Sequence, residues 1–265
     1  MSQFSWRIRT AWWLTARLAP WMSSSQQLYY ERLEKLVRDG LRVLDVGCGK
    51  EFLIGWLRPD LHQRWSASIL DRITIFGVDP WMPSLQQNTN RRIACAVAEQ
   101  LPIASSSFDL VTANMVVEHL ADPDAVVREV MRVLRPGGCF VFHTPNLRCP
   151  VIGVSKWLPH SVKRAAVPIV EGGRGKEDVF PTHYRMNTRE AVAATARRVG
   201  AELGWVDAVF TAPFTQSLGP LVVFELLITK MLRGAPFARW RPDLICMLRK
   251  PKVYDRLDNC GPARN

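Results

Sequence analysis

The sequence lacks the cysteine patterns of a metal-binding or disulfide-stabilised protein. Its six cysteines form no Cys-x-x-Cys pair, and several lie within strand-like apolar runs, so neither a zinc site nor a disulfide framework is expected. A signal peptide is not expected either, because Arg7, Arg9 and Arg17 interrupt the apolar stretch that such a peptide needs. These absences predict a protein of the reducing cytoplasm with no bound metal.

No apolar run is long enough to cross a membrane. The longest, from Leu218 to Leu232, contains Glu225 and Lys230 and is shorter than the roughly 20 apolar residues of a spanning helix. Acidic residues are also few, since 24 Asp and Glu accompany 35 Lys and Arg, for a net charge of +11. Such an excess favours an anionic partner, either nucleic acid or an acidic lipid surface.

Basic residues gather next to this apolar run. Between Lys230 and Lys252 there are seven Lys or Arg and one acid, Asp243. An apolar segment followed by a basic one is typical of a helix that lies on an anionic membrane. The alternative is an additional packed helix with a solvated basic face. Nucleic acid is disfavoured, because no RNA-binding module and no alternation of aromatic and basic residues is present.

What the chain has instead is short apolar, β-branched runs that alternate with amphipathic helices. Strands are predicted at residues 42–47, 73–79, 108–114, 139–144, 203–210 and 244–248. Helices are predicted at 52–57, 121–134 and 188–200, with two more between residues 6 and 37 that Pro20 separates. Pro136-Gly-Gly138 is predicted as a turn. The alternation predicts βαβ units, a parallel sheet and a ligand site at the carboxyl ends of its strands.

A glycine-rich turn follows the first predicted strand. Asp45-Val-Gly-Cys-Gly49 lets the backbone turn sharply and approach a ligand closely. The Asp45 carboxylate would either order this loop or hold a cationic group of the ligand. Asp79 ends the second strand, where an acid would accept hydrogen bonds from ribose hydroxyls. Taken singly, these features also fit an ordinary tight turn and a solvated acid.

Four segments together resemble the class I methyltransferases that use S-adenosylmethionine (SAM), particularly the small-molecule branch that includes the ubiquinone-biosynthesis methyltransferases. In chain order they are Val43-Leu-Asp-Val-Gly-Cys-Gly49, Val78-Asp79, Ala98-Glu-Gln-Leu-Pro102 with Phe108-Asp-Leu-Val111, and Leu134-Arg-Pro-Gly-Gly138. The match covers about residues 41 to 146. The resemblance implies an α/β fold with a Rossmann-like, seven-stranded, mostly parallel sheet and helices on both of its faces.

We expect two further units around that sheet. Residues 1–39 would form an N-terminal helical cap, and 40–265 the SAM-dependent methyltransferase domain. Within this domain, 145–187 would be an irregular insertion on the substrate side, and 215–235 an apolar helix between the last two strands.

The resemblance also assigns roles in cofactor binding. Gly47 and Gly49 would cradle the amino-acid end of SAM, and Asp79 would hold its ribose. Ala98 and Glu99 would flank the adenine, and Asn114 would lie beside the sulfonium. The sequence departs from the family at Lys50-Glu51, because many relatives carry a third glycine two residues after the second. This departure would reshape the pocket for the methionine end.

Catalysis of methyl transfer needs few protein groups, because SAM already carries a good leaving group. The protein must align the acceptor and, for a hydroxyl acceptor, remove a proton. His119 and His143 lie on the ligand edge of the predicted sheet, so either would serve as the base, while a structural hydrogen bond is the alternative for each. His183 lies in a loop expected to fold over that edge, where it would contact the substrate or cap the next helix.

The predicted function is methyl transfer from SAM to a small-molecule or lipid-linked acceptor, at oxygen, by a cytoplasmic enzyme that visits an anionic membrane surface. The sequence specifies no oligomeric state. One alternative is an RNA or protein methyltransferase, which the positive charge favours. Another is a non-catalytic SAM-binding scaffold, which Glu51 and the absence of a clear catalytic signature favour.

Overall fold

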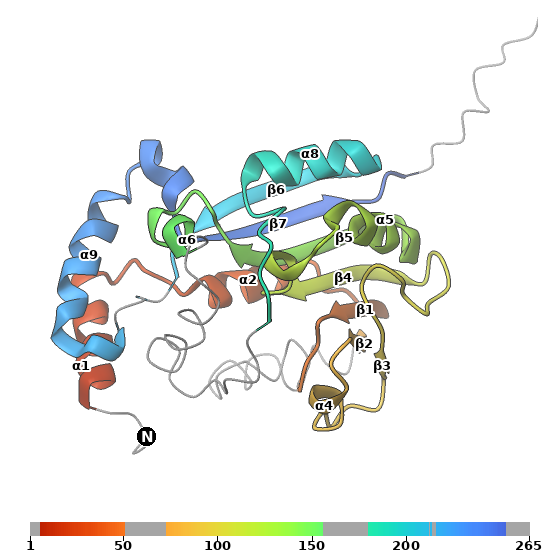
Figure 1. Cartoon of the computed structure of the whole chain (residues 1–265), viewed down its shortest axis with the longest axis horizontal. Helices are drawn as coiled ribbons and strands as arrows, with labels where there is room; N and C mark the ends of the chain where they lie inside the picture. The colour runs from red at the N-terminus through yellow and green to blue at the C-terminus, as the bar shows by residue number, and fades with distance from the viewer. Residues whose placement is uncertain (1–5, 51–72, 156–179, 212, 214–215, 253–265) are drawn as a thin grey trace, which may run out of the picture.

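Seven strands form a single sheet in the order β3-β2-β1-β4-β5-β7-β6 (Figure 1). The computed structural model describes residues 6–50, 73–155, 180–211, 213 and 216–252. The strands are β1 (Leu41–Val46), β2 (Ile73–Asp79), β3 (Ile93–Cys95), β4 (Phe108–Asn114), β5 (Leu134–Pro145), β6 (Glu202–Val209) and β7 (Asp243–Arg249). Strands β1 to β5 run parallel, whereas β7 is antiparallel to both of its neighbours. The expected seven-stranded, mostly parallel sheet is therefore confirmed.

Two parts of the sheet differ from the sequence-based prediction. Strand β3 was not predicted, because a three-residue strand with one exposed and two half-buried residues leaves no periodic signal. The turn predicted at Pro136-Gly-Gly138 is wrong, since β5 already begins at Leu134. Phe108 pairs with Leu134 and Leu110 with Cys139, so residues 135–138 form a bulge opposite Asp109. Gly137 permits that bulge by adopting a φ of 79°.

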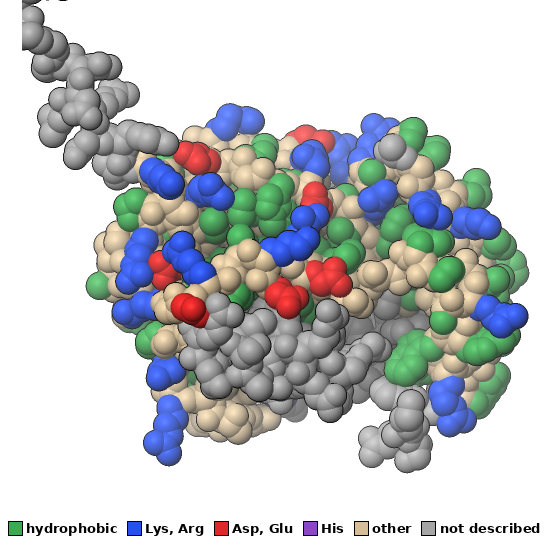
Figure 2. Space-filling model, turned by 180° about the vertical axis from the view of Figure 1, so that it is seen from behind, with side chains coloured by type: hydrophobic (Ala, Val, Ile, Leu, Met, Phe, Trp, Pro, Cys, Tyr) green, Lys and Arg blue, Asp and Glu red, His purple; other side chains and the backbone are tan. Residues whose placement is uncertain are grey.

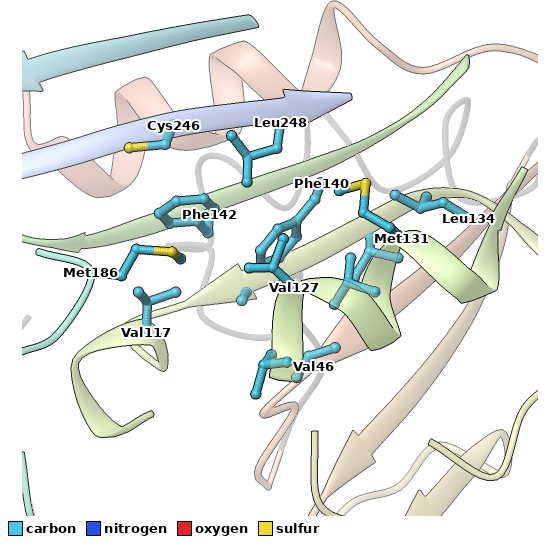
Figure 3. Packing of buried hydrophobic residues seen from close by; sticks show 14 of the residues in the cluster. Val46, Val117, Val127, Met131, Leu134, Phe140, Phe142, Met186, Cys246 and Leu248 are labelled. Atoms are coloured by element: carbon cyan, nitrogen blue, oxygen red, sulfur yellow. The ribbon is translucent and has the colours of Figure 1, made fainter. Parts of the chain in front are cut away.

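Helices cover both faces of the sheet, because alternate strand residues point to opposite sides. In β1, Leu44 and Val46 belong to the larger core cluster, which includes residues of α5 (Pro123–Val133) and α8 (Arg189–Val199). Leu41 and Val43 belong instead to the cluster formed with α2 (Ser25–Glu34). Figure 3 shows part of the larger cluster, including Val127 of α5 and Phe140 of β5.

The remaining described helices are shorter or lie at one end of the sheet. They are α1 (Trp6–Leu18), α4 (Met82–Leu85), η2 (Val117–His119), α6 (Pro150–Ser155), η4 (Gln216–Leu221), α9 (Val222–Met231) and η5 (Ala235–Trp240). Among the described helices, none has both the length and the apolar character needed to cross a membrane. The helix predicted at 52–57 and residues 156–179 of the predicted insertion lie outside the described residues.

The two N-terminal helices belong to different parts of the molecule. Helix α2 packs on the sheet, while α1 packs on α9 through a small cluster that includes Ala11, Ala19, Val222 and Leu226. Figure 1 shows this α1–α9 pair beside the sheet. Because β6 and β5 are both antiparallel to β7, the connection from β6 to β7 lies at the carboxyl ends of the parallel strands. The helix α9 is therefore attached to the edge of the sheet where a ligand is expected.

Candidate cofactor and substrate site

The turn after β1 contains two glycines whose surroundings differ. Gly47 has a φ of 74° and Gly49 a φ of 55°, both in the left-handed region that favours glycine. A Cβ on Gly47 would lie 2.3 Å from Cγ2 of Val116, whereas a Cβ placed on Gly49 would have no atom of the described residues within 4 Å apart from its chain neighbours. Gly47 is thus required by close packing, and Gly49 leaves open space in which a ligand can approach the backbone.

The carboxylate of Asp79 connects this turn to the end of β2. Its Oδ2 accepts a hydrogen bond from the Gly49 N–H at 2.9 Å, and its Oδ1 accepts one from the Trp81 N–H at 2.8 Å. An ionised carboxylate has about four lone-pair positions. The two donors from described residues occupy two of these positions, and a ribose hydroxyl would take another. The Asn88 amide also donates to the Gly49 carbonyl at 2.9 Å, which holds the turn from the other side.

Asp45 lies beneath the turn, in the core of the sheet. Its side chain is buried, and its Oδ1 accepts a hydrogen bond from the Thr112 hydroxyl of β4 at 2.8 Å. Of the two roles considered for Asp45, the burial and this contact favour ordering of the loop.

The segment after β3 reaches the same edge of the sheet. The Ala96 N–H donates to the Asp79 carbonyl at 3.2 Å, so the residues that follow start next to the candidate ribose site. Ala98 is half-buried against the core, and Glu99 is exposed. An apolar contact from Ala98 with a polar rim at Glu99 is compatible with the adenine position that the resemblance implies.

Asn114 ends β4 on the other side of the β1 turn. It is followed by Met115, a non-glycine residue with a φ of 56°, and such backbone strain is concentrated at functional sites. The Met115 N–H donates to the His143 carbonyl at 2.9 Å. Gly47, Asp79 and Asn114 thus follow or end three adjacent parallel strands, β1, β2 and β4.

His143 lies in the interior, although it is near the carboxyl end of β5. Its side chain is only 3% exposed, with Nδ1 at 2.9 Å from Asn114 Oδ1 and Nε2 at 3.3 Å from Asp243 Oδ2. Its ring also lies against that of Tyr29, with 5.6 Å between centroids. Both ring nitrogens are therefore engaged, which favours a role for His143 in positioning Asn114 over a role as a base.

His119 is the more accessible histidine, with a side chain that is 30% exposed. Its Nδ1 lies 2.8 Å from the Pro181 carbonyl oxygen. A carbonyl oxygen only accepts hydrogen bonds, so Nδ1 carries the hydrogen and Nε2 is the basic atom of the neutral ring. The geometry thus favours the tautomer that a general base acting through Nε2 would need, and this atom lies 4.0 Å from Glu118 Oε1.

A row of aromatic rings crosses the carboxyl edge of the sheet. Phe180 contacts Trp81 with ring centroids 5.9 Å apart, and it contacts His119 with centroids 6.2 Å apart. Trp81 follows the end of β2 and His119 follows the end of β4, and β1 lies between these strands. Phe180 therefore bridges the two sides of the candidate cofactor site, which the sequence did not predict.

The loop that carries His183 is anchored to the turn at η2. The N–H groups of His183 and Tyr184 donate to the Glu118 carbonyl at 2.7 and 3.0 Å. Met186 is fully buried in the larger core cluster, close to Val117 in Figure 3. The His183 side chain itself is exposed. The next helix, α8, is capped by Thr188, which accepts from the Ala191 N–H at 3.1 Å, so His183 is not needed as its cap.

Glu118 is a buried acid that the sequence analysis did not single out. Its Oε2 accepts a hydrogen bond from the Thr144 hydroxyl at 3.0 Å, and Thr144 in turn accepts one from the Asn187 amide at 2.7 Å. Burial raises the pKa of the Glu118 carboxyl above its ordinary value, and the opposing effects of His119 and Thr144 are smaller. The only signal in the sequence was the position of this glutamate next to His119, shortly after β4.

The raised pKa of Glu118 predicts a dependence of stability on pH. The native carboxyl keeps its proton to higher pH than the carboxyl of the unfolded chain, so the free energy of unfolding falls as pH rises from the ordinary glutamate pKa through the native one. We expect Glu118→Gln to remove this fall, because glutamine does not titrate. Urea unfolding between about pH 4 and pH 8 measures the effect.

The control for this experiment is Glu129→Gln. A hydrogen bond from Arg132 lowers the pKa of Glu129, so this glutamate stabilises the fold above its unfolded pKa and loses that contribution as pH falls. The control should therefore lower the free energy of unfolding by a nearly constant amount above that pKa and change its slope only on the acidic side. Identical pH profiles for the parent and Glu118→Gln would contradict the predicted burial effect.

Comparison with known proteins identifies the family resemblance. Residues 44–142 match the family model described as a methyltransferase domain. Malonyl-(acyl-carrier protein) O-methyltransferase from Hahella chejuensis is 36% identical over 129 residues, which cover 46% of this chain and 44% of that protein. Ubiquinone biosynthesis O-methyltransferase from Agrobacterium fabrum is 31% identical over 137 residues, which cover 46% of this chain and 50% of that protein. The chain thus spans about half the length of the curated relatives it matches.

Solved structures give the same fold over most of the chain. Phosphoethanolamine N-methyltransferase 2 from Haemonchus contortus, in complex with S-adenosyl-L-methionine, matches with a TM-score of 0.54 at 15% identity. The match covers 92% of this chain and 57% of that one. At this identity the likeness concerns the fold alone. Together the comparisons confirm the predicted resemblance to SAM-dependent methyltransferases and the Rossmann-like fold.

Proposed function

We propose that this chain, whose residues 44–142 match the family model described as a methyltransferase domain, transfers a methyl group from SAM to a small-molecule or lipid-linked acceptor. The observation that carries the proposal is the Asp79 carboxylate, which joins the ends of β1 and β2 and keeps acceptor capacity for a ribose. Both relatives described above are named O-methyltransferases, and these names support oxygen as the acceptor atom.

The residues at this edge suit SAM. The open space beside Gly49 would receive the amino-acid end, and Asp79 would accept the ribose hydroxyls. Ala98 and Glu99 would flank the adenine, and Asn114, held by His143, would lie beside the sulfonium. When bound, SAM supplies an activated methyl group on a good leaving group. The protein's own contribution is to align the acceptor and exclude water.

A hydroxyl acceptor also needs a base. We propose His119 for this role, because its Nδ1–H faces the Pro181 carbonyl and its Nε2 carries the lone pair. His183 would contact the acceptor from the loop that is anchored on Glu118. Phe180 would exclude water by bridging Trp81 and His119 over the cofactor.

The proposal is tested by titrating the full chain with SAM and with its demethylated product by calorimetry. We expect micromolar affinity for both. Asp79→Ala should weaken SAM binding about 10- to 100-fold, because hydrogen bonds to a charged acceptor are lost. The matched control is Asp207→Ala, since Asp207 pairs with Arg32 at 2.6 Å on the edge strand β6. Equal SAM affinity of Asp79→Ala and the parent would exclude the ribose assignment.

The positive charge of the chain favours, as an alternative substrate, a macromolecule that is either RNA or a protein. That alternative predicts nucleic acid or protein retained on purification and released by salt. A non-catalytic scaffold would bind SAM in the titration and transfer no methyl group to any acceptor.

A reducing cytoplasm, with contact to a membrane surface, is the compartment that we propose. The described cysteines carry thiols, as expected where disulfides do not form. Burial raises the pKa of the Cys48 thiol to about 12, which keeps it unreactive.

A further inference from the structure

The helix α9 exposes an apolar face to solvent. Five apolar residues lie one, three or four positions apart, which places them on one side of the helix. They are Leu221, Phe224, Leu227, Ile228 and Met231. Met231 is 76% exposed and Phe224 is 68% exposed. The opposite side of the helix is already used, because Val222 and Leu226 are buried against α1. A solvent-facing side with this composition indicates an interaction surface.

Helix α1, which packs against α9, also exposes tryptophans and arginines. Trp6 and Trp13 are 58% and 60% exposed. The Arg7 guanidinium lies 5.7 Å from the centre of the Trp6 ring, and the Arg17 guanidinium lies 5.5 Å from the centre of the Trp13 ring. Exposed tryptophans paired with cations are typical of the level of lipid headgroups, where an apolar ring and a charge are both accommodated.

The charge around these helices has one sign. Residues 6–24 contain no acid, and residues 210–241 contain one, Glu225. The exposed cations near the apolar face are Arg7, Arg9, Arg17, Lys230, Arg233 and Arg239. Figure 2 shows basic and hydrophobic side chains interspersed at the side of the molecule where α1 and α9 lie. Exposed cations beside apolar side chains complement a partner that has an anionic surface and an apolar interior.

We propose that the α1–α9 face, defined by the five exposed apolar residues of Leu221–Met231, docks on the surface of an anionic lipid bilayer. Helix α9 has 10 residues, which suits a helix that lies in the interface and not one that spans the membrane. The apolar side chains enter the acyl boundary, and the surrounding cations contact lipid phosphates.

The docking face is coupled to the proposed catalytic edge. The side-chain amide of Asn146, just after β5, donates to the carbonyls of Arg239 and Arg241 at 2.9 and 2.7 Å. These bonds hold the segment after α9 at the carboxyl ends of the parallel strands. A bilayer under the α1–α9 face would therefore present a lipid-linked acceptor on the side of the site. This last step rests on the proposed methyl transfer, whereas the docking itself does not.

The test is co-sedimentation of the full chain with phosphatidylcholine vesicles and with vesicles that also contain phosphatidylglycerol. We expect binding to the anionic vesicles that weakens as salt is raised. Phe224→Ser/Met231→Ser should lower the partition coefficient at least about tenfold, because two apolar side chains leave the bilayer. Arg9→Glu/Arg17→Glu should remove most of the preference for anionic vesicles. Leu203→Ser is the control, since Leu203 is an exposed leucine on β6, outside this face.

Each outcome decides the proposal. Equal partition of Phe224→Ser/Met231→Ser and the parent would overturn it, as would a parent that binds neither vesicle type or binds both equally. Light scattering without vesicles tests whether a second copy of the chain occupies this face instead. A parent dimer that becomes monomeric in Phe224→Ser/Met231→Ser would identify the face as a contact between two copies and overturn the proposal. SAM affinity is measured for every variant, so a folding defect or failure of the methyl-transfer proposal is recognised separately from failure of docking.

Discussion

Gly47→Ala is expected to lower the free energy of unfolding by about 2 to 5 kcal/mol. This cost is the sum of the penalty for alanine in a left-handed backbone conformation and the penalty for an overpacked contact. The new methyl group would lie 2.3 Å from Cγ2 of Val116, and the φ of 74° would remain necessary because the Gly47 N–H donates to the Val78 carbonyl. Urea unfolding of the parent and the variant measures this cost.

Gly49→Ala is the matched variant, with a different expected result. Its φ of 55° carries the backbone cost of about 1 to 2 kcal/mol, but its methyl group would enter space in which no atom of the described residues beyond its chain neighbours lies within 4 Å. Because we place the amino-acid end of SAM in that space, the variant should remain folded and lose SAM affinity about tenfold or more. A Gly49→Ala protein that binds SAM as tightly as the parent would show that the cofactor does not occupy this space.

His119→Ala should lower kcat roughly 100-fold or more, the usual contribution of a general base. The affinity for SAM should change little, because His119 approaches the edge from the side of Phe180 and Pro181. The measurement is turnover against pH on an acceptor found by screening phenolic, isoprenoid and sugar-lipid compounds. Loss of the limb of the pH profile that reports the base, together with the fall in kcat, supports the assignment.

His183→Ala and His143→Ala separate the other two histidines from this role. We expect His183→Ala to raise KM for the acceptor and reduce turnover with SAM binding retained, since its side chain is exposed on the anchored loop. His143→Ala should instead destabilise the fold by about 3 to 5 kcal/mol, because Asp243 would be left buried without its partner at 3.3 Å. A kcat for His119→Ala equal to that of the parent would remove His119 from the mechanism.

Much of the fold was predictable from local sequence. The strands at 73–79 and 108–114 occur with the predicted bounds, because a buried parallel strand is a continuous apolar run with β-branched residues. The turn at Gly47 and Gly49 and the acid at Asp79 were predictable for the same reason, since backbone conformation and strand ends are set by neighbouring residues. Strand β3 and the bulge in β5 were missed, because pairing with β2 and with β4 and β7 decides them.

By itself, then, the sequence determined the order of the elements, the parallel sheet and the edge at which a ligand is expected. The surroundings of the histidines depend on the tertiary structure alone. His143 is buried in contact with Asp243, 100 positions away, whereas His119 contacts Pro181, 62 positions away. The same holds for α9, whose apolar composition suits either a core or a surface. Only the packing of Val222 and Leu226 on α1 shows which side is used and leaves Phe224 and Met231 facing solvent, because burial depends on neighbours that are distant in the chain.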